Sequence, residues 1–391
     1  MKILLVHDVQ AYKQNGVSVS LGILATELKK MGHDIRILTL ADGIRSHKDE
    51  GGNYYLSSVP APVYPDIRIR LRRHSRLVKE IIAWDPDIIH TNCEFSTFRI
   101  AKFIRRRCAV PPVWVHTFHT DYRYYIGVLG KSRLVTDRFV PWYLNGHFSR
   151  SDALIVPTRK IDDYVHSGSF TRYEGYNTAV IPTGIDFSEL RPQDAEDREN
   201  VRRELGVPSD AKLLIFLGRI SPEKNLDELL DYFAVYRASH DDVYLLTVGN
   251  GPFKDTLLRH VKRLSLEDRV IVCDGVPHDR VSRYYNAADV FVSASVSETQ
   301  GLTFYEAMYC GLPVLAKDRK CLEDSVTEGV NGAFFDDADS FAVSLGRIID
   351  LRKNGGGAST LPDCFDSTFF ARSVERLYQG LLAEERKAGR R

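Results

Sequence analysis

Short apolar segments alternate with amphipathic segments of helical length along this chain of 391 residues. KILLVHDV opens the pattern, SLGILATELKKM follows, and DIRILTL is the next apolar run, with Gly32 where a helix commonly ends. Further apolar runs lie at residues 87–91, 113–119, 153–158 and 179–184, and then at 212–219, 243–249, 269–275, 289–295 and 312–318. Apolar strands separated by helices are typical of parallel sheets covered on both faces. The sequence therefore predicts an α/β fold of two doubly wound domains, joined near residue 190.

The length and composition agree with two domains, because 391 residues with 43% hydrophobic content exceed what one compact core usually holds. No run of about 18 apolar residues is present, so no segment is expected to span a bilayer. The chain opens on MKILLVHDV, without the layout of a signal peptide, and we expect it to be cytoplasmic. Its six cysteines lie far apart, unlike the close pairs of zinc sites, and are expected to be reduced and mostly buried.

The two halves of the chain carry opposite net charge. Residues 1–185 hold 26 Lys and Arg against 17 Asp and Glu, a net charge of +9, whereas the remainder holds 27 against 35, a net charge of −8. The first half is therefore expected to meet an anionic partner. The near-neutral total charge and the lack of a matching RNA- or DNA-binding module argue against nucleic acid.

The basic residues of the first half are clustered. One cluster, in DIRIRLRRHSRLVK, consists of Arg68, Arg70, Arg72, Arg73, Arg76 and Lys79. A second cluster consists of Arg99, Lys102, Arg105, Arg106 and Arg107. From Leu71 onward, apolar residues fall near one face of a helix, opposite the arginines, and they are Leu71, Val78, Ile81 and Ile82. Two interpretations stay open: a solvated polar face on a packed helix, or a surface that docks on anionic lipid headgroups.

Ligands of doubly wound sheets bind beyond the carboxyl ends of the strands, and four such positions carry polar chemistry. After the first strand, Gly16 in QNGVSVS allows a tight turn that presents amides at a helix N-terminus, a setting that suits phosphate, although an ordinary turn is the simpler explanation of a single glycine. His119 follows VWVHTF. A histidine at the end of a strand is either a structural residue or a titratable group of a catalytic site. Arg219 and Lys224 in GRISPEK suit a phosphate, although cations are common in surface loops.

The fourth position holds two glutamates, Glu298 and Glu306, in SETQGLTFYEAMYC. Thr303 and Glu306 fit a Thr-x-x-Glu capping box, which explains Glu306 without a ligand. The box does not explain Glu298, which precedes the helix on a loop that contains Gly301. A phosphate over the amides of Leu302 and Thr303 would have one carboxylate on each side. Carboxylates accept hydrogen bonds from hydroxyls, so the pair suits a sugar.

Six motifs occur along the chain in the order NGVSVS, HTFHTDYRYYI, VIPTGID, GRISPEKN, VGNGP and SETQGLTFYEAMYCGLPVLAKD. In these motifs the chain resembles the GT-B glycosyltransferases of family 4, retaining enzymes with two Rossmann-like domains that face each other across a cleft. The resemblance runs from Met1 to roughly the last helix. Within this family, QNGVSVS, VHTFHTDYRYYI and SETQGLT are most similar to the bacterial diacylglycerol glucosyltransferases, which make monoglucosyl diacylglycerol at the inner leaflet.

The resemblance implies a division into domains and a reaction. An N-terminal acceptor domain at residues 1–187 would be completed by a C-terminal helix at residues 366–391, and a nucleotide-sugar domain would span residues 188–365. Glucose would pass from UDP-glucose to 1,2-diacylglycerol with retention, without an obligatory metal ion or cofactor. Asp85-Pro86-Asp87 has the spacing of a metal site but is interpreted as a turn. The protein would lie at the inner face of the plasma membrane, docked on its anionic surface.

The resemblance also implies roles for residues. Glu298 would hold hydroxyls of the donor sugar, and Glu306 would bind the ribose. Arg219 and Lys224 would neutralise the leaving phosphate, and His119 would lie beside the reacting sugar. The remaining donor-binding residues would act chiefly through the backbone, and they are Gly16, Asn250, Gly251, Val276, Gln300, Gly301, Leu302 and Thr303.

Two alternatives to this function stay open. One is a family 4 enzyme with another acceptor or donor, such as a phosphatidylinositol mannosyltransferase, and the other is a sensor that binds a sugar nucleotide without catalysis. The sensor is disfavoured because all five residues with implied roles in the chemistry or the ribose contact are intact. The tyrosines at 122, 124 and 125 after His119 are left without an assigned role.

Overall fold

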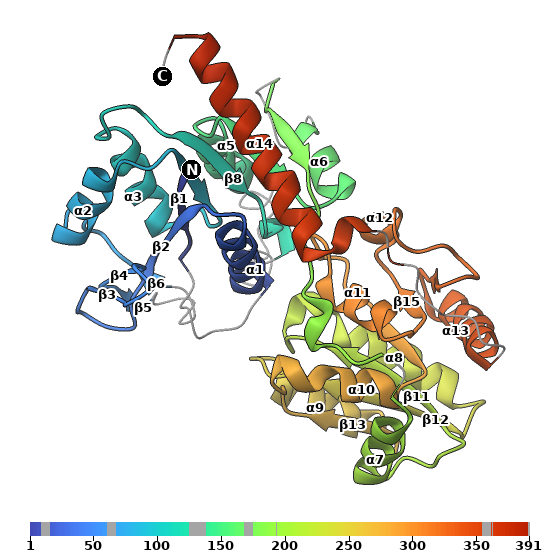
Figure 1. The fold of residues 1–391 in the computed structure, drawn as a ribbon. Helices are drawn as coiled ribbons and strands as arrows, with labels where there is room; N and C mark the ends of the chain where they lie inside the picture. Colours follow the sequence, from blue (N-terminus) through green and yellow to red (C-terminus); the bar gives the residue numbers. More distant parts are fainter. Residues whose placement is uncertain are drawn as a thin grey trace. The chain divides into compact units, whose positions relative to one another are not determined.

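The computed structural model describes residues 1–8, 16–60, 68–124, 138–167, 175–192, 194–353, 361 and 363–389. These residues form two compact units (Figure 1). Unit 1 holds the described residues of 1–123, 138–185 and 364–389, and unit 2 holds those of 186–363 together with Tyr124. The chain therefore enters unit 2 after Ile185 and returns to unit 1 at Cys364.

Unit 1 is built on an eight-stranded sheet with the strand order β10-β9-β8-β7-β1-β2-β4-β3, in which only the β3–β4 pair is antiparallel. Its strands are β1 (Lys2–Val6), β2 (Asp34–Leu40), β3 (His47–Lys48), β4 (Tyr54–Leu56), β7 (Ile88–Thr91), β8 (Val113–Thr117), β9 (Ala153–Val156) and β10 (Thr178–Val180). Its helices include α1 (Gly16–Lys30), α2 (Arg76–Trp84), α3 (Ser96–Arg105), α5 (Val140–Phe148), α6 (Arg159–His166) and α14 (Ser367–Lys387). The strands β5 (Val59–Pro60) and β6 (Arg68–Ile69) form a separate antiparallel pair.

The apolar strands of unit 1 are buried on both faces. Successive side chains of a strand point to opposite faces, and in β1 they enter two different cores. Ile3 and Leu5 pack with residues of α1 and α14, whereas Leu4 and Val6 pack with residues of α2 and α3. All four side chains are fully buried. The prediction from the continuous apolar run, a central strand covered on both faces, is therefore confirmed.

Helix α14 belongs to unit 1, where it packs against α1 and β8. Asp366 begins the helix, since its Oδ1 accepts hydrogen bonds from the amides of Thr368 and Phe369 at 2.8 and 3.1 Å. The fully buried Tyr378 hydroxyl lies 2.6 Å from His90 Nδ1 at the centre of the sheet. The end of the chain is thus part of the core of unit 1.

Unit 2 is built on a six-stranded parallel sheet with the order β13-β12-β11-β14-β15-β16. Its strands are β11 (Lys212–Leu217), β12 (Val243–Val248), β13 (Val270–Cys273), β14 (Val290–Ser293), β15 (Val314–Ala316) and β16 (Gly332–Phe334). Its helices are α7 (Ala195–Leu205), α8 (Leu226–Arg237), α9 (Lys254–Arg263), α10 (Val281–Ala287), α11 (Leu302–Tyr309), α12 (Arg319–Leu322) and α13 (Ala338–Lys353). The order changes direction at β11, beside β14, so ligands are expected beyond the carboxyl ends of these two strands.

The helix that the apolar spacing placed from Leu71 onward begins later in the structure. Leu71 is 76% exposed, and α2 starts at Arg76, where Ser75 Oγ accepts the amide of Val78 at 3.2 Å. The main-chain amide of Arg70 instead donates to Ser96 Oγ at 2.9 Å, which holds residues 70–74 in an irregular segment. Helix α2 ends at Asp85 in the left-handed conformation, so Asp85-Pro86-Asp87 is the turn that the sequence indicated.

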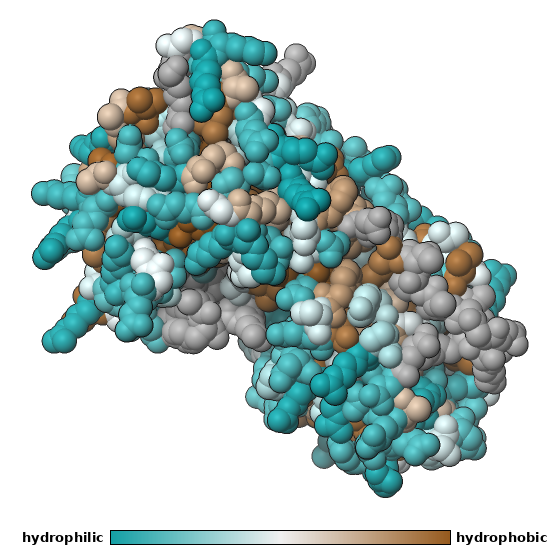
Figure 2. Space-filling model, viewed as in Figure 1, coloured by the Kyte–Doolittle hydropathy of each residue, from teal (hydrophilic) through white to brown (hydrophobic). Residues whose placement is uncertain are grey.

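Hydrophilic residues cover most of the face shown in Figure 2, and the hydrophobic residues that reach it are scattered. Within the ranges that the structure describes, no helix is both long enough and apolar enough to cross a membrane. Four of the six cysteines, Cys93, Cys108, Cys310 and Cys321, are buried as thiols.

Candidate active site

One group of the predicted site residues lies at the carboxyl ends of β11 and β14 in unit 2. These two strands are neighbours, with Leu214 opposite Val290. Lys224 ends the short 3-10 helix η3 (Pro222–Lys224) after β11, and Glu298 lies in the loop after β14. Lys224 Nζ lies 2.6 Å from Glu298 Oε1, although 74 positions separate the two residues, and their side chains are only 17% and 16% exposed. The fold therefore joins two predicted residues in a charge-assisted hydrogen bond.

The two loops that carry GRISPEK and VGNGP are packed backbone to backbone. The amide of Ile220 donates to the carbonyl of Asn250 at 3.0 Å, and the amide of Phe253 donates to the carbonyl of Ile220 at 3.1 Å. A Cβ on Gly251 would lie 2.0 Å from the carbonyl oxygen of Ile220, a distance at which atoms overlap. Only glycine fits at position 251 without separating the loops.

Helix α11 begins at Gly301, not at the expected capping box. Gly301 is the N-cap residue and has a φ of 75°, in the left-handed region that favours glycine. No side chain caps this helix, and Thr303 already lies inside the first turn. The capping-box explanation of Glu306 is therefore wrong, because the turn that Gly301 makes starts the helix two residues earlier. The first amides of α11, from Leu302 onward, are the donors that the sequence assigned to a phosphate.

The Glu306 carboxylate has other partners. It is 7% exposed, and its Oε2 accepts the Tyr285 hydroxyl at 3.0 Å. Its Oε1 lies 3.3 Å from His278 Nε2, and His278 Nδ1 lies 2.8 Å from Glu189 Oε2. The hydrogen bond to Glu306, followed by that to Glu189, raises the pKa of His278 to about 9, so the imidazole is charged at neutral pH.

The other predicted donor residues occupy strand ends in the same unit. Arg219 is half-buried one residue past Gly218, and Asn250 is exposed after β12. Val276 is half-buried beyond β13, and Gln300 is 3% exposed beside Gly301. Their contacts with a donor stay predictions.

His119, the predicted catalytic residue of unit 1, lies beyond the end of β8. His119 Nε2 donates to Asn92 Oδ1 at 2.9 Å, and Asn92, 3% exposed, follows β7. Burial lowers the pKa of His119 to about 4, so the ring is neutral at physiological pH. Gly16, the other predicted residue of this unit, begins α1, and residues 9–15 before it lie outside the described ranges.

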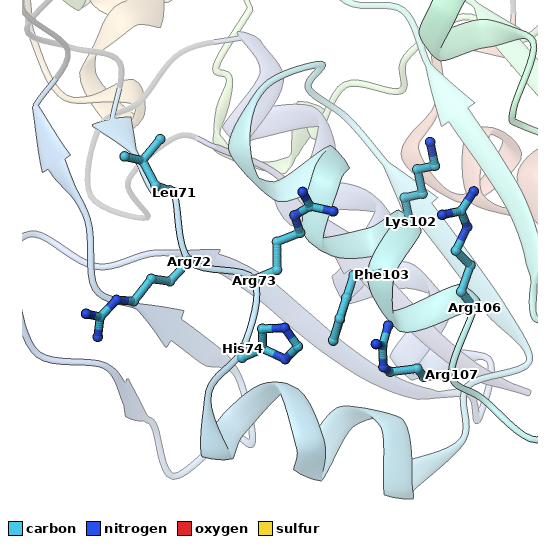
Figure 3. Close-up of a pocket in the computed structure, with 8 residues that line it drawn as sticks. All are labelled: Leu71, Arg72, Arg73, His74, Lys102, Phe103, Arg106 and Arg107. Carbon is cyan, nitrogen blue, oxygen red and sulfur yellow. The ribbon is translucent and has the colours of Figure 1, made fainter.

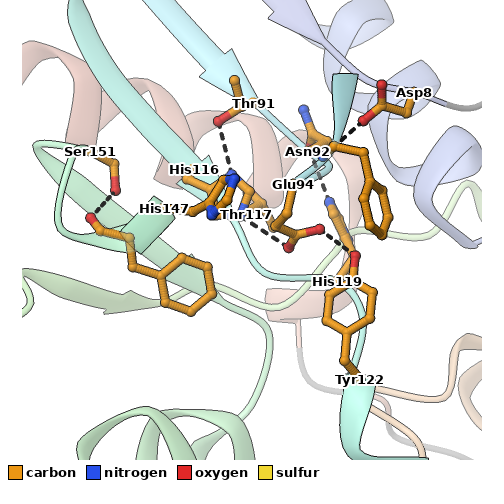
Figure 4. A network of polar contacts seen from close by, with 12 residues as sticks. Asp8, Thr91, Asn92, Glu94, His116, Thr117, His119, Tyr122, His147 and Ser151 are labelled. Atoms are coloured by element: carbon orange, nitrogen blue, oxygen red, sulfur yellow. Dashed lines mark hydrogen bonds and ion pairs between the residues drawn. The ribbon is translucent and has the colours of Figure 1, made fainter. Parts of the chain in front are cut away.

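A buried polar network adjoins His119 (Figure 4). Its centre is Glu94, 2% exposed, whose Oε1 accepts from His116 Nε2 at 3.2 Å and whose Oε2 accepts from the Tyr122 hydroxyl. Thr91 Oγ1 lies 2.8 Å from His116 Nδ1, so both ring nitrogens of His116 have a hydrogen-bond partner. Burial raises the pKa of Glu94, but the hydrogen bonds from His116 and Tyr122 outweigh it and hold the pKa below its ordinary value. Tyr122 thus anchors the segment after His119, while Tyr125 lies outside the described residues.

A second buried carboxylate lies at the end of β1. Asp8 Oδ1 accepts the amide of Thr97 at 2.8 Å, and its Oδ2 accepts the amide of Phe95 at 3.2 Å, so Asp8 caps α3 in place of a local side chain. Burial raises the pKa of Asp8 to about 7. The carboxylate therefore titrates near physiological pH.

Sequence reasoning missed Asp8, Glu94 and His278, although a signal for each was present. Asp8 and Glu94 follow β1 and β7 by two and three residues, and His278 lies five residues beyond β13. All three are therefore near the carboxyl ends of parallel strands, where ligands of such sheets bind. Applying that rule to every strand, and not only to the four most polar ends, would have included them.

Two arginines of the expected docking surface are not available for docking. Arg68 is 7% exposed and donates to Ser58 Oγ at 2.7 Å and to Asp42 Oδ1 at 2.8 Å. Arg70 is 9% exposed and donates to the carbonyls of Ser57 and Arg72 at 2.7 and 2.8 Å. Their assignment to the surface is wrong, because their guanidinium groups hold the segment around β6 in place.

The exposed basic residues instead surround a hollow of about 860 Å³ between the segment before α2 and helix α3 (Figure 3). Its lining consists of Leu71, Arg72, Arg73, His74, Lys102, Phe103, Arg106 and Arg107. Burial, and then the cations of Arg150, Arg106 and Arg73, lower the pKa of Lys102. Arg76 and Lys79 are also exposed, on α2. We call Arg72, Arg73, Arg76, Lys79, Lys102, Arg106 and Arg107 the basic surface.

No group of three or more His, Cys, Asp or Glu side chains within the described ranges is arranged to hold a metal ion.

Comparisons with known proteins agree with the two units. A family model described as "Glycosyl transferases group 1" matches residues 197–355, and one described as "Glycosyltransferase Family 4" matches residues 14–189. A sucrose-phosphate synthase from Thermosynechococcus elongatus superimposes with a TM-score of 0.77 at 20% identity, covering 98% of this chain and 100% of that structure. The fold is therefore that of a GT-B glycosyltransferase.

Two curated relatives cover most of the chain. Alpha-monoglucosyldiacylglycerol synthase from Streptococcus pneumoniae is 33% identical over 337 residues, 86% of this chain and 75% of the relative. The protein of the same name from Acholeplasma laidlawii is 27% identical over 401 residues, 95% of each chain. The chain accordingly belongs to glycosyltransferase family 4.

Proposed function

We propose that this glycosyltransferase moves glucose from UDP-glucose to 1,2-diacylglycerol and forms α-monoglucosyldiacylglycerol. The observation that carries this proposal is the similarity to two proteins of that name along most of their length, at 33% and 27% identity. The geometry of unit 2 supports a sugar-nucleotide donor, because a cation and a carboxylate from separate loops meet beside the N-terminus of α11.

In the proposed reaction, unit 2 binds the donor. Glu298 accepts hydrogen bonds from glucose hydroxyls, and Glu306 accepts them from the ribose. The bond between the anomeric carbon and the β-phosphate oxygen breaks, and negative charge builds up on UDP. Lys224, held by Glu298, and Arg219 stabilise that charge, a task for which fixed cations in a partly buried site are effective. This electrostatic role removes the need for an obligatory metal ion.

In the same proposal, unit 1 binds the acceptor. The acceptor hydroxyl attacks the anomeric carbon from the face that UDP leaves, and its proton passes to an oxygen of the departing phosphate, so the configuration is retained. His119 is neutral at physiological pH and contributes a hydrogen bond rather than a charge. The backbone amides at Gly16 contact the departing diphosphate.

The acceptor resides in a membrane, and the basic surface supplies the proposed contact with it. Five cations of the basic surface line the hollow in unit 1, and Arg76 and Lys79 lie on α2, where Glu80 Oε1 is 3.3 Å from Arg76 Nε. Each Lys or Arg near an anionic bilayer contributes about 1 kcal/mol of attraction. The protein is therefore proposed to act at the anionic inner face of the plasma membrane.

Product formation in mixed micelles tests this function. Purified protein is given UDP-glucose and diacylglycerol, with and without anionic phospholipid, and the lipid product is identified together with its anomeric configuration. Glu298→Ala is expected to abolish the product, whereas Glu267→Ala, an exposed carboxylate elsewhere in unit 2, should leave the yield unchanged. Slow release of UDP without a glucolipid would contradict diacylglycerol as the acceptor. An unchanged rate in the presence of EDTA is expected for a reaction without a metal ion.

A further inference from the structure

His278 lies between two carboxylates that come from different elements of unit 2. Its Nδ1 is 2.8 Å from Glu189 Oε2 on the 3-10 helix η2 (Phe187–Glu189), and its Nε2 is 3.3 Å from Glu306 Oε1 on α11. Both ring nitrogens face acceptors, so only the protonated ring donates to both. The side chain is 27% exposed, which leaves it open to substitution without disturbing the core.

The second oxygen of Glu306 is also held. Tyr285, fully buried on α10, donates its hydroxyl to Glu306 Oε2 at 3.0 Å. Two donors from two elements therefore fix the rotation of one carboxylate. A carboxylate offers about four lone-pair positions, so two acceptor positions stay open to hydroxyls of a ligand.

We propose that His278 is a positioning residue of the donor site, which orients the Glu306 carboxylate for the two ribose hydroxyls of the nucleotide. The inference rests on the proposed function, in which Glu306 binds the ribose. The orientation is set before the nucleotide arrives, so less conformational freedom is lost on binding. Because the ribose is remote from the reacting carbon, the contact acts on affinity for the donor and leaves the chemical step nearly unaffected.

The charge of His278 decides how firmly Glu306 is held. The titratable groups that face this pair are Glu189, Tyr285 and Cys310, and the pKa values of the tyrosine and the cysteine are both raised by burial and by Glu306. Below a pH of about 9, His278 is the only one of these groups that carries positive charge. After that proton is lost, the ring keeps a single N–H, which is expected to stay on the shorter contact, 2.8 Å to Glu189, so that Glu306 loses one of its two donors. Donor affinity is therefore expected to fall as the pH rises through about 9.

The fold around this site does not depend on His278 alone. Phe187 stacks on Tyr309 with ring centroids 4.3 Å apart, which attaches η2 to α11 independently of the histidine. Removing the imidazole should therefore loosen Glu306 without detaching η2.

Calorimetric titration with UDP tests the inference between pH 6.5 and pH 10. His278→Gln keeps a hydrogen-bond donor but cannot carry a charge, and we expect about tenfold weaker UDP binding at pH 7, a higher KM for UDP-glucose and a nearly unchanged kcat. Glu189→Gln should move the loss of affinity to lower pH, because one partner of the imidazolium is removed. His260→Gln is the matched control, since His260 on α9 of the same unit pairs with Asp231 on α8 at 2.7 Å.

The outcomes separate the two levels of the proposal. The protonation of UDP itself changes with pH in the same way for all variants, so only the differences in UDP affinity between variants test the role of His278. His278→Gln with wild-type affinity and a wild-type pH profile would overturn the positioning role alone. Wild-type protein that binds no UDP would overturn the proposed donor and, with it, this inference. If His278→Gln fails to fold, the pH profile of Glu189→Gln decides, and an unshifted profile counts against the role.

Discussion

Removing the charge of Lys224 is the most direct perturbation of the proposed chemistry. Lys224→Met keeps most of the length of the side chain and deletes the ammonium group that lies 2.6 Å from Glu298 Oε1. If Lys224 stabilises the departing diphosphate, the loss of one preorganised donor should lower kcat by about 10²- to 10³-fold, or about 2.7–4 kcal/mol. The measurement is the initial rate of glucolipid formation at saturating donor.

The same substitution has a smaller effect on stability, which the burial of the pair sets. Exposed ion pairs contribute about 0–1 kcal/mol, and deleting one partner of a fully buried pair costs about 3–5 kcal/mol. With side chains 17% and 16% exposed, this pair lies between those limits, and we expect a loss of about 1–2 kcal/mol in the free energy of unfolding. Denaturant unfolding of Lys224→Met and of Lys224→Met/Glu298→Gln measures it, because the second substitution removes the negative charge that faces Lys224 in the wild type.

The outcomes of this experiment are distinct. The double variant should regain stability but not turnover. Lys212→Met is the matched control, since Lys212 pairs with Asp242 at 3.0 Å at the opposite, amino end of β11. A fall in kcat of less than about threefold in folded Lys224→Met, against the loss expected for a preorganised donor, would refute the electrostatic role of this lysine.

Three further predictions concern other parts of the molecule. Gly251→Ala should lower the free energy of unfolding by about 1–3 kcal/mol in thermal or denaturant scans, because its Cβ would overlap a carbonyl oxygen, whereas Gly346→Ala, which meets nothing within 4 Å, should be neutral or stabilising. The pKa of His278 is raised in the folded state, so the stabilisation of the fold by the charged imidazole is fully present below about pH 6.5 and disappears as the pH rises through about 9. The free energy of unfolding of His278→Gln should therefore differ from that of the wild type by about 2–3 kcal/mol at pH 6–7 and by almost nothing at pH 10. Arg106→Glu/Arg107→Glu should weaken sedimentation with anionic vesicles at least tenfold without changing affinity for UDP, and equal binding by wild type and variant would contradict docking through this surface.

The strands and their positions along the chain could be predicted from the sequence, because that information is local. Residues 3–6 of KILLVHDV are apolar at every position, and a strand buried on both faces requires that pattern. The sequence placed Gly301 in the loop before the helix, and glycine suits that position because few other residues adopt a φ of 75°. The capping box failed for the opposite reason: a spacing of three residues is common, and nothing in the spacing says where the helix begins.

The partners of the charged residues could not be predicted from the sequence. Arg68, Arg72 and Arg106 are equivalent by composition, yet Arg68 is buried against Ser58 while the other two line the hollow. Nothing in the spacing of residues 189, 278 and 306 along the chain indicates that the two glutamates lie on either side of one histidine. Such contacts depend on the packing of three separate elements.

Sequence patterns alone therefore predict the alternation of strands and helices, the two doubly wound units and the strand ends that carry polar residues, because hydrophobic periodicity and turn residues act over a few neighbours. The folded chain was needed to show that Lys224 meets Glu298 across 74 positions, that Tyr122 donates to Glu94, and which cations face solvent. The physical reason is that a charged side chain gains from pairing only where packing brings its partner within hydrogen-bond reach and excludes water, and neither condition is encoded by neighbours in the chain.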